Sequence, residues 1–103
     1  LNDILESIKQ IEEYIQGASE DGFKKDKKLQ DAVIRRIEII GEASRNIPRA
    51  LKEKNAEIPW HELAQFRDFI SHSYFEASLD RIWKTAKNRM PQIKEKFQKI
   101  KFV

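Results

Sequence analysis

The sequence has no cysteine, and only three glycines and three prolines interrupt its 103 residues. Without cysteine it can build neither a disulfide framework nor a thiolate zinc site, and it has no cysteine nucleophile. No uncharged apolar stretch approaches the ~18 residues needed to cross a bilayer, and no basic-then-apolar signal segment opens the sequence. From these absences we expect a soluble, cytoplasmic protein that does not act in a membrane.

Charge is what the sequence has in excess. Charged residues make up 36% of it and hydrophobic residues 40%, whereas average proteins have ~25% and ~45 to 50%. That balance is typical of amphipathic helices that bury one face and expose the other. A chain of 103 residues has the length of one domain. We therefore expect residues 1–103 to form a single domain with one core.

The charges are unevenly distributed, although the net charge is only +3. The first 22 residues are acidic with Lys9 as their only basic residue, whereas Glu95 is the only acid after residue 80. The C-terminal segment is therefore strongly basic, and a basic helix can bind polyphosphate because each neutralised phosphate releases counterions. The alternative is a solvated lysine face, and the sequence leaves both interpretations open.

Apolar residues recur at intervals of three and four, and nowhere does the strict apolar–polar alternation of a strand persist. This periodicity predicts long helices over residues 3–16, 26–46, 58–73 and 78–100, and a short helical segment over 48–54. Helices of these lengths suit an antiparallel bundle. We predict an all-α fold, an antiparallel bundle of four to five helices.

Single residues mark the expected ends of these helices. Gly17 is expected to end the first helix and Asp26 to cap the second, with a polar connection over residues 17–25. Ser78 is expected to cap the last helix, and Pro91 to kink it.

Few groups in the sequence can perform catalysis. His61 and His72 are the only imidazoles, and neither has a histidine or carboxylate cluster at metal-ligand spacing. There is also no glycine-rich phosphate loop, so we predict neither a metal site nor a cofactor. One short segment nevertheless gathers a cation, a carboxylate, an imidazole and a phenol within eight residues: Arg67, Asp68, His72 and Tyr74.

Helical geometry sorts these side chains onto different faces. Asp68 and His72 are four residues apart and share a face, so the carboxylate can orient the imidazole or hold it protonated. Arg67 and His72 are five residues apart, about 140° around a straight helix, so they cannot reach one phosphate together. Either the helix unwinds near His72, or a two-fold axis brings the same segment of a second chain opposite.

Arginine and histidine together suit RNA cleavage by the 2′-hydroxyl without a metal ion. The imidazole can move the proton of the attacking or leaving oxygen near neutral pH, while the guanidinium binds the phosphate oxygens. The structural alternative is Arg67 paired with Asp68, beside a histidine that caps the helix end. The spacing alone does not decide between them.

The same residues carry a resemblance to a known family. Arg67, His72 and Tyr74 form the R-x4-H-x-Y signature of the HEPN superfamily, and the chain resembles its HepT-like branch of ribonuclease toxins. The chain departs from that branch before the motif arginine, where relatives commonly have small residues and it has Gln65 and Phe66. Flanking blocks similar to that branch are residues 32–43, Ile58-Pro59-Trp60 and Asp80-Arg81-Ile82-Trp83.

The resemblance implies a bundle that dimerises through its motif helices and forms one composite cleft. In that cleft Arg67 and His72 would cleave RNA without a metal. It also implies a cognate nucleotidyltransferase antitoxin that neutralises the toxin by adenylylating the motif tyrosine, here Tyr74. An AMP group at Tyr74 would add charge and bulk at the cleft and so exclude phosphate. From spacing alone, Tyr74 is equally a helix-end residue with its ring in the core.

The resulting hypothesis is a homodimeric ribonuclease toxin with Arg67, His72 and Asp68 as catalytic residues. Its main alternative is a non-catalytic HEPN module that partners a nucleotidyltransferase and binds nucleotide or RNA without cutting it. A third hypothesis is a purely structural helical partner. Cleavage of RNA by the purified chain discriminates among them.

Four residues outside the motif segment also carry expectations. Trp60 and Trp83 lie among apolar neighbours and are expected in the core rather than in base stacking. Gly41 would let another helix approach closely, at a helix-propensity cost of about 1 kcal/mol. Its neighbour Glu42 is a candidate for the cleft.

Overall fold

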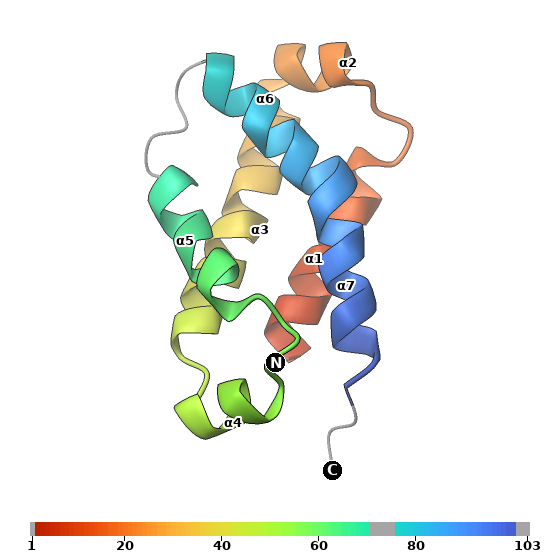
Figure 1. The fold of residues 1–103 in the computed structure, drawn as a ribbon. Helices are drawn as coiled ribbons and strands as arrows, with labels where there is room; N and C mark the ends of the chain where they lie inside the picture. The colour runs from red at the N-terminus through yellow and green to blue at the C-terminus, as the bar shows by residue number, and fades with distance from the viewer. Residues whose placement is uncertain (1, 71–75, 101–103) are drawn as a thin grey trace.

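The computed structural model of the protein describes residues 2–70 and 76–100, and every regular element in them is helical (Figure 1). The predicted all-α fold is confirmed. In chain order the elements are α1 (Asn2–Ile15), α2 (Glu20–Lys25), α3 (Lys27–Arg45), α4 (Arg49–Lys54), α5 (Trp60–Ile70), α6 (Glu76–Lys84), the π-helical turn η1 (Thr85–Arg89) and α7 (Met90–Gln98).

Helix α3 is central because it packs against α1 on one side and α5 on the other (Figure 1). The continuous helix made by α6, η1 and α7 completes the bundle, since α7 and η1 pack on α1 and α6 packs on α2. The predicted apolar stripe of the first long helix is buried at Ile4, Ile8, Ile11 and Ile15 of α1. The stripe predicted for the second comprises Leu29, Val33, Ile37 and Ile40; on α3 the last three are fully buried and Leu29 is half-buried. Each buried side chain contributes about 1.5–3 kcal/mol when removed from water.

Both tryptophans lie in the core, as predicted, with 9% of Trp60 and 8% of Trp83 exposed. The Trp60 ring meets Phe97 edge to face, with ring centroids 5.8 Å apart. Its indole Nε1 donates a hydrogen bond of 3.0 Å to the Asn55 carbonyl, which fixes the loop that precedes α5. Burial of Trp60 therefore sets where the motif helix begins.

The polar connection predicted over residues 17–25 is wrong in its second half, where α2 forms. Gly17 does end the first helix, with a φ of +77° that favours glycine. Ser19 then caps α2, because its hydroxyl accepts a 3.0 Å hydrogen bond from the Gly22 amide. Phe23, the one buried residue of α2, packs against Trp83 with ring centroids 5.4 Å apart. One apolar residue in a six-residue helix leaves no periodic stripe in the sequence.

The start of the last helix also differs from the prediction. Helix α6 begins at Glu76, so Ser78 is the third residue of the helix and not the residue that precedes it.

The kink predicted at Pro91 takes the form of the π turn η1 directly before it. In η1 the Met90 amide donates to the Thr85 carbonyl five residues back. A proline ring clashes with the carbonyl four residues before it in a regular α-helix, and a wider turn relieves that clash. The helix changes direction between α6 and α7 (Figure 1).

No helix in the described part of the chain is long and apolar enough to span a bilayer.

Candidate functional site

The last turn of α5 carries Arg67 and Asp68, two of the predicted site residues. Leu63 and Phe66 bury the inner face of this helix, with 0% and 5% exposed, whereas Arg67 and Asp68 are exposed. The predicted residues His72 and Tyr74 lie outside the described residues. The structure thus brings Arg67 and Asp68 to the surface at the end of α5, and their relation to His72 stays a prediction.

Gly41 of α3 makes the close approach that the sequence predicted. A Cβ atom on Gly41 would lie 3.1 Å from the Arg67 amide nitrogen and 3.4 Å from the Leu63 carbonyl oxygen. The backbone of α5 therefore rests on the backbone of α3 at the residue that carries the motif guanidinium.

Arg45 joins the site, and the sequence analysis missed it. It lies one turn after Gly41 on α3, and its Nη2 donates to Oδ1 of Asp68 over 3.3 Å. The side chains are 44% and 72% exposed, so the ion pair itself contributes at most about 1 kcal/mol. Its consequence is positional, because it brings a second guanidinium to the end of α5 that holds Arg67. The only signal in the sequence is the four-residue spacing of Gly41 and Arg45, which puts them on one face.

Glu42 is half-buried on α3, one residue after Gly41. Successive residues of an α-helix are 100° apart around its axis, so Glu42 does not share the face on which Gly41 meets α5. Its predicted role in the cleft stays a prediction.

The first turn of α5 is held by a second polar contact that the sequence analysis missed. Arg89 of η1 donates from Nε to one carboxylate oxygen of Glu62 over 2.7 Å, and from Nη2 to the other over 2.6 Å. The hydrogen bonds from Arg89 hold the pKa of Glu62 below its usual value and, in return, raise the pKa of Arg89. Both groups are therefore charged at neutral pH, and this two-pronged pair ties α5 to the π turn.

The arrangement can bind an anion, and the described residues offer no metal-binding cluster. Across residues 2–70 and 76–100 no three histidine or carboxylate side chains gather as metal ligands would. His61 is exposed at the start of α5. Arg45 and Arg67 instead both lie near the opposite end of the helix, where Arg45 donates to Asp68. Guanidinium groups in such a position fork onto phosphate oxygens.

Comparison with known proteins gives consistent matches over nearly the whole chain. The model of the family described as "Ribonuclease HepT-like" matches residues 4–100. A Thermococcus cleftensis protein described as a probable ribonuclease HepT is 48% identical over 101 residues, which cover 98% of this chain and 92% of that protein. A Caldanaerobacter subterraneus protein described as a candidate RNase is 36% identical over 100 residues, covering 97% of this chain and 89% of the relative.

A longer relative comes from Methanocaldococcus jannaschii and is described as a gamma-glutamylcyclotransferase and candidate RNase. It is 51% identical over 100 residues, which cover 97% of this chain but only 45% of that protein. The chain thus spans less than half of this relative's length. No solved structure shows significant similarity to the chain.

Proposed function

Because the chain belongs to the ribonuclease HepT-like family, we propose that it is an endoribonuclease that cleaves RNA without a metal ion. Arg67 binds the scissile phosphate, His72 moves the protons, and Asp68 orients the imidazole. The observation that carries the proposal is the exposed position of Arg67 on a helix end that is fixed by Gly41. Catalysis by Arg67 requires its guanidinium to be held in place, because it stabilises the transition state only at the correct distance and orientation.

The proposed reaction is attack of the 2′-hydroxyl on the adjacent phosphorus. An imidazole of His72 takes the 2′-hydroxyl proton as the bond from oxygen to phosphorus forms. The bond from phosphorus to the 5′-oxygen breaks, and an imidazolium returns a proton to that oxygen. The products are a 2′,3′-cyclic phosphate and a free 5′-hydroxyl. Arg67 stabilises the negative charge that builds on the non-bridging oxygens.

Two copies of the chain form the cleft in this proposal. Arg67 and His72 are five residues apart, and a single straight helix would separate them by about 140°. A two-fold axis beside the end of α5 places His72 of one copy opposite Arg67 of the other. We expect static light scattering to give twice the chain mass at micromolar concentration. A monomer under these conditions would contradict the shared cleft.

Arg45 refines the role of Asp68. One oxygen of Asp68 accepts from Arg45, which leaves the second oxygen to accept from an imidazole. The contact favours one orientation of the carboxylate, as an orienting residue requires. Asp68→Asn is therefore expected to reduce the rate less than loss of His72, because it weakens orientation without removing the proton carrier.

The proposed regulation is adenylylation of Tyr74 by a partner nucleotidyltransferase. The phenolic oxygen attacks the α-phosphorus of ATP, the phenolic proton is lost, and pyrophosphate leaves. The bound AMP places a negative phosphate near the position where the RNA phosphate must bind, so it repels and blocks the substrate. In this proposal the chain is the toxin, and the partner is its antitoxin.

Incubation of the purified chain with single-stranded RNA in excess EDTA tests the function. We expect cleavage to cyclic-phosphate ends in the wild type and none in His72→Ala, which controls for contaminating nuclease. Binding without cleavage in the wild type would support the non-catalytic binding module instead.

A further inference from the structure

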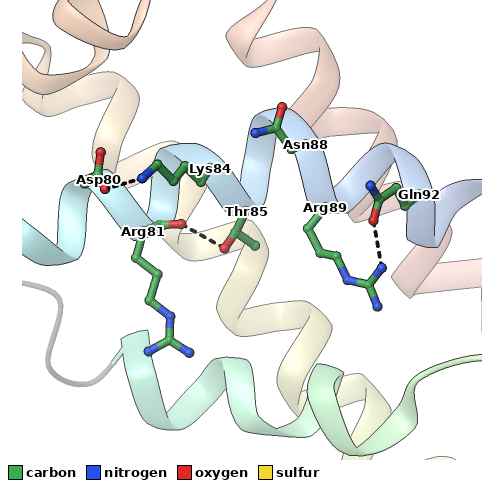
Figure 2. A pocket seen from close by; sticks show the side chains of 7 residues that line it. All are labelled: Asp80, Arg81, Lys84, Thr85, Asn88, Arg89 and Gln92. Carbon is green, nitrogen blue, oxygen red and sulfur yellow. Dashed lines mark hydrogen bonds and ion pairs between the residues drawn. The ribbon is translucent and has the colours of Figure 1, made fainter.

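A groove follows one face of the last helix and is not part of the proposed cleft. It has a volume of about 450 Å³, and Figure 2 shows side chains from α6, η1 and the start of α7 lining it. A π turn holds more residues than an α turn, and it therefore rotates Arg89 toward the face that carries Arg81. The residues relevant here are Asp80, Arg81, Lys84, Asn88, Arg89 and Gln92.

The groove is cationic, with three basic side chains and one carboxylate. Lys84 lies 2.9 Å from one oxygen of Asp80, and Lys24 lies 3.8 Å from the other. The hydrogen bond between Asp80 and Lys84 lowers the pKa of Asp80 and raises the pKa of Lys84. Glu20 of α2 also lies beside Asp80 and Lys84. The two lysines therefore balance these acidic neighbours, and the charges of Asp80 and Lys84 stay fixed near neutral pH.

The three basic residues of the groove, Arg81, Lys84 and Arg89, have different roles in it. Arg89 lines one side of the groove in a fixed position, because its guanidinium donates to Glu62 and, over 2.8 Å, to Gln92. Lys84 has a side chain that is 65% exposed, and its ammonium carries three donors, of which Asp80 takes one. Arg81 is exposed and extends from α6 toward the C-terminal end of α5 (Figure 2). That end of α5 carries Arg67, so the groove begins beside the proposed cleft.

The chemistry of the lining favours a phosphate backbone over bases. No aromatic side chain is among the described residues that line the groove, so a base has no ring on which to stack. Guanidinium, ammonium and amide donors instead match phosphate oxygens, which position a nucleic acid without reading its sequence.

We propose that this groove binds phosphates of the RNA strand next to the scissile bond, with Arg81 and Lys84 as the cations and the Asn88 amide as a further donor. The proposal rests on the ribonuclease function and gives two basic residues of the C-terminal segment a task. In this proposal the RNA strand binds along α6 and η1, and this alignment brings the scissile phosphate to Arg67.

The test measures binding separately from cleavage. The probe is a fluorescently labelled 2′-O-methyl RNA strand, which lacks the attacking hydroxyl and cannot be cut. Its anisotropy is measured with the wild type and with Arg81→Gln/Lys84→Gln over a range of salt concentrations. The matched control is Lys9→Gln/Lys28→Gln, which removes the same charge from exposed positions on α1 and α3.

We expect the groove variant to bind at least tenfold more weakly than the control variant at low salt. Two lost phosphate contacts should also reduce the slope of log affinity against log salt by about 1.4, at ~0.7 for each contact on a single strand. The loss should be equal for uridine and adenosine strands. Thermal unfolding of both variants checks that the fold is intact.

Equal binding by the groove and control variants would overturn the proposal, and so would a loss confined to one base. If the wild type cleaves RNA while the groove variant binds like the control, only the groove assignment fails. If the wild type does not cleave RNA but the groove variant alone loses binding, the groove stands and the ribonuclease function fails.

Discussion

Gly41 of α3 and Arg67 of α5 are in backbone contact, so the core of the bundle directly positions the predicted phosphate-binding residue. A Cβ atom at residue 41 would lie 3.3 Å from the Cβ atom of Arg67. A change in the packing of α3 against α5 at Gly41 would therefore also move Arg67.

Substitutions of Gly41 test this contact. Gly41→Val should lower the free energy of unfolding by about 1–3 kcal/mol, because its methyl groups overpack the junction of α3 and α5. Gly41→Ala should change it less, since a helix-propensity gain of about 1 kcal/mol offsets the crowding, yet it should still reduce cleavage by displacing Arg67. Urea denaturation measures both, with Ala50→Val on exposed α4 as the control. Wild-type stability in Gly41→Val would show that the helices are not this close.

Glu62 and Arg89 make stability depend on pH in a defined direction. The folded-state pKa of Glu62 is lowered from 4.5 by its hydrogen bonds from Arg89. Its ionised form therefore stabilises the fold fully above that ordinary value, and the stabilisation is lost as the pH falls through the lowered pKa. Glu62→Gln should lower the free energy of unfolding by about 1 kcal/mol at pH ~7, a value discounted for solvent exposure. The two proteins should converge in acid.

A matched control for this pair is Glu53→Gln. Glu53 accepts from Arg49 over 3.1 Å on α4, but its side chain is 68% exposed, so its loss should cost less than ~0.5 kcal/mol. A gap between wild type and Glu62→Gln that persists unchanged in acid would contradict the charged pair.

Tyr74 is predicted to be a regulatory residue and not a catalytic one. A phenol has an ordinary pKa of ~10 and is a poor proton carrier at neutral pH, so Tyr74→Phe should keep most of the cleavage activity. It should lose the ability to be silenced by a partner nucleotidyltransferase with ATP. Mass spectrometry after co-expression should show added AMP on the wild type only. AMP on Tyr74→Phe, or on Ser71 or Ser73, would contradict the assignment.

The long helices could be predicted because the apolar residues that they bury recur along the sequence at helical spacing. The isoleucines of α1 repeat at helical spacing, and each is buried. Helix α2 could not be predicted in this way, since one residue, Phe23, anchors it through a contact with Trp83 sixty residues away. The residues around Phe23 give no indication of a contact with a residue so far along the sequence.

The same limit applies to the site. The sequence places Arg67 and Asp68 one after the other and predicts the close approach at Gly41, but it does not say which helix approaches. The ion pair of Arg45 with Asp68 spans 23 residues, and that of Glu62 with Arg89 spans 27. Both depend on how helices cross, which is set by tertiary packing. The roles of His72, Tyr74 and Glu42 stay predictions.

Mixing two inactive variants tests the central claim most directly. Arg67→Ala lacks the phosphate-binding group, His72→Ala lacks the proton carrier, and each alone should lose at least ~10²-fold in cleavage rate. A mixed dimer of the two keeps one Arg67 and one His72 on opposite chains. If the cleft is shared, co-refolding the variants should restore RNA cleavage in EDTA. If each chain held a complete site, or if neither residue acted in cleavage, the mixture would show no gain over the separate variants.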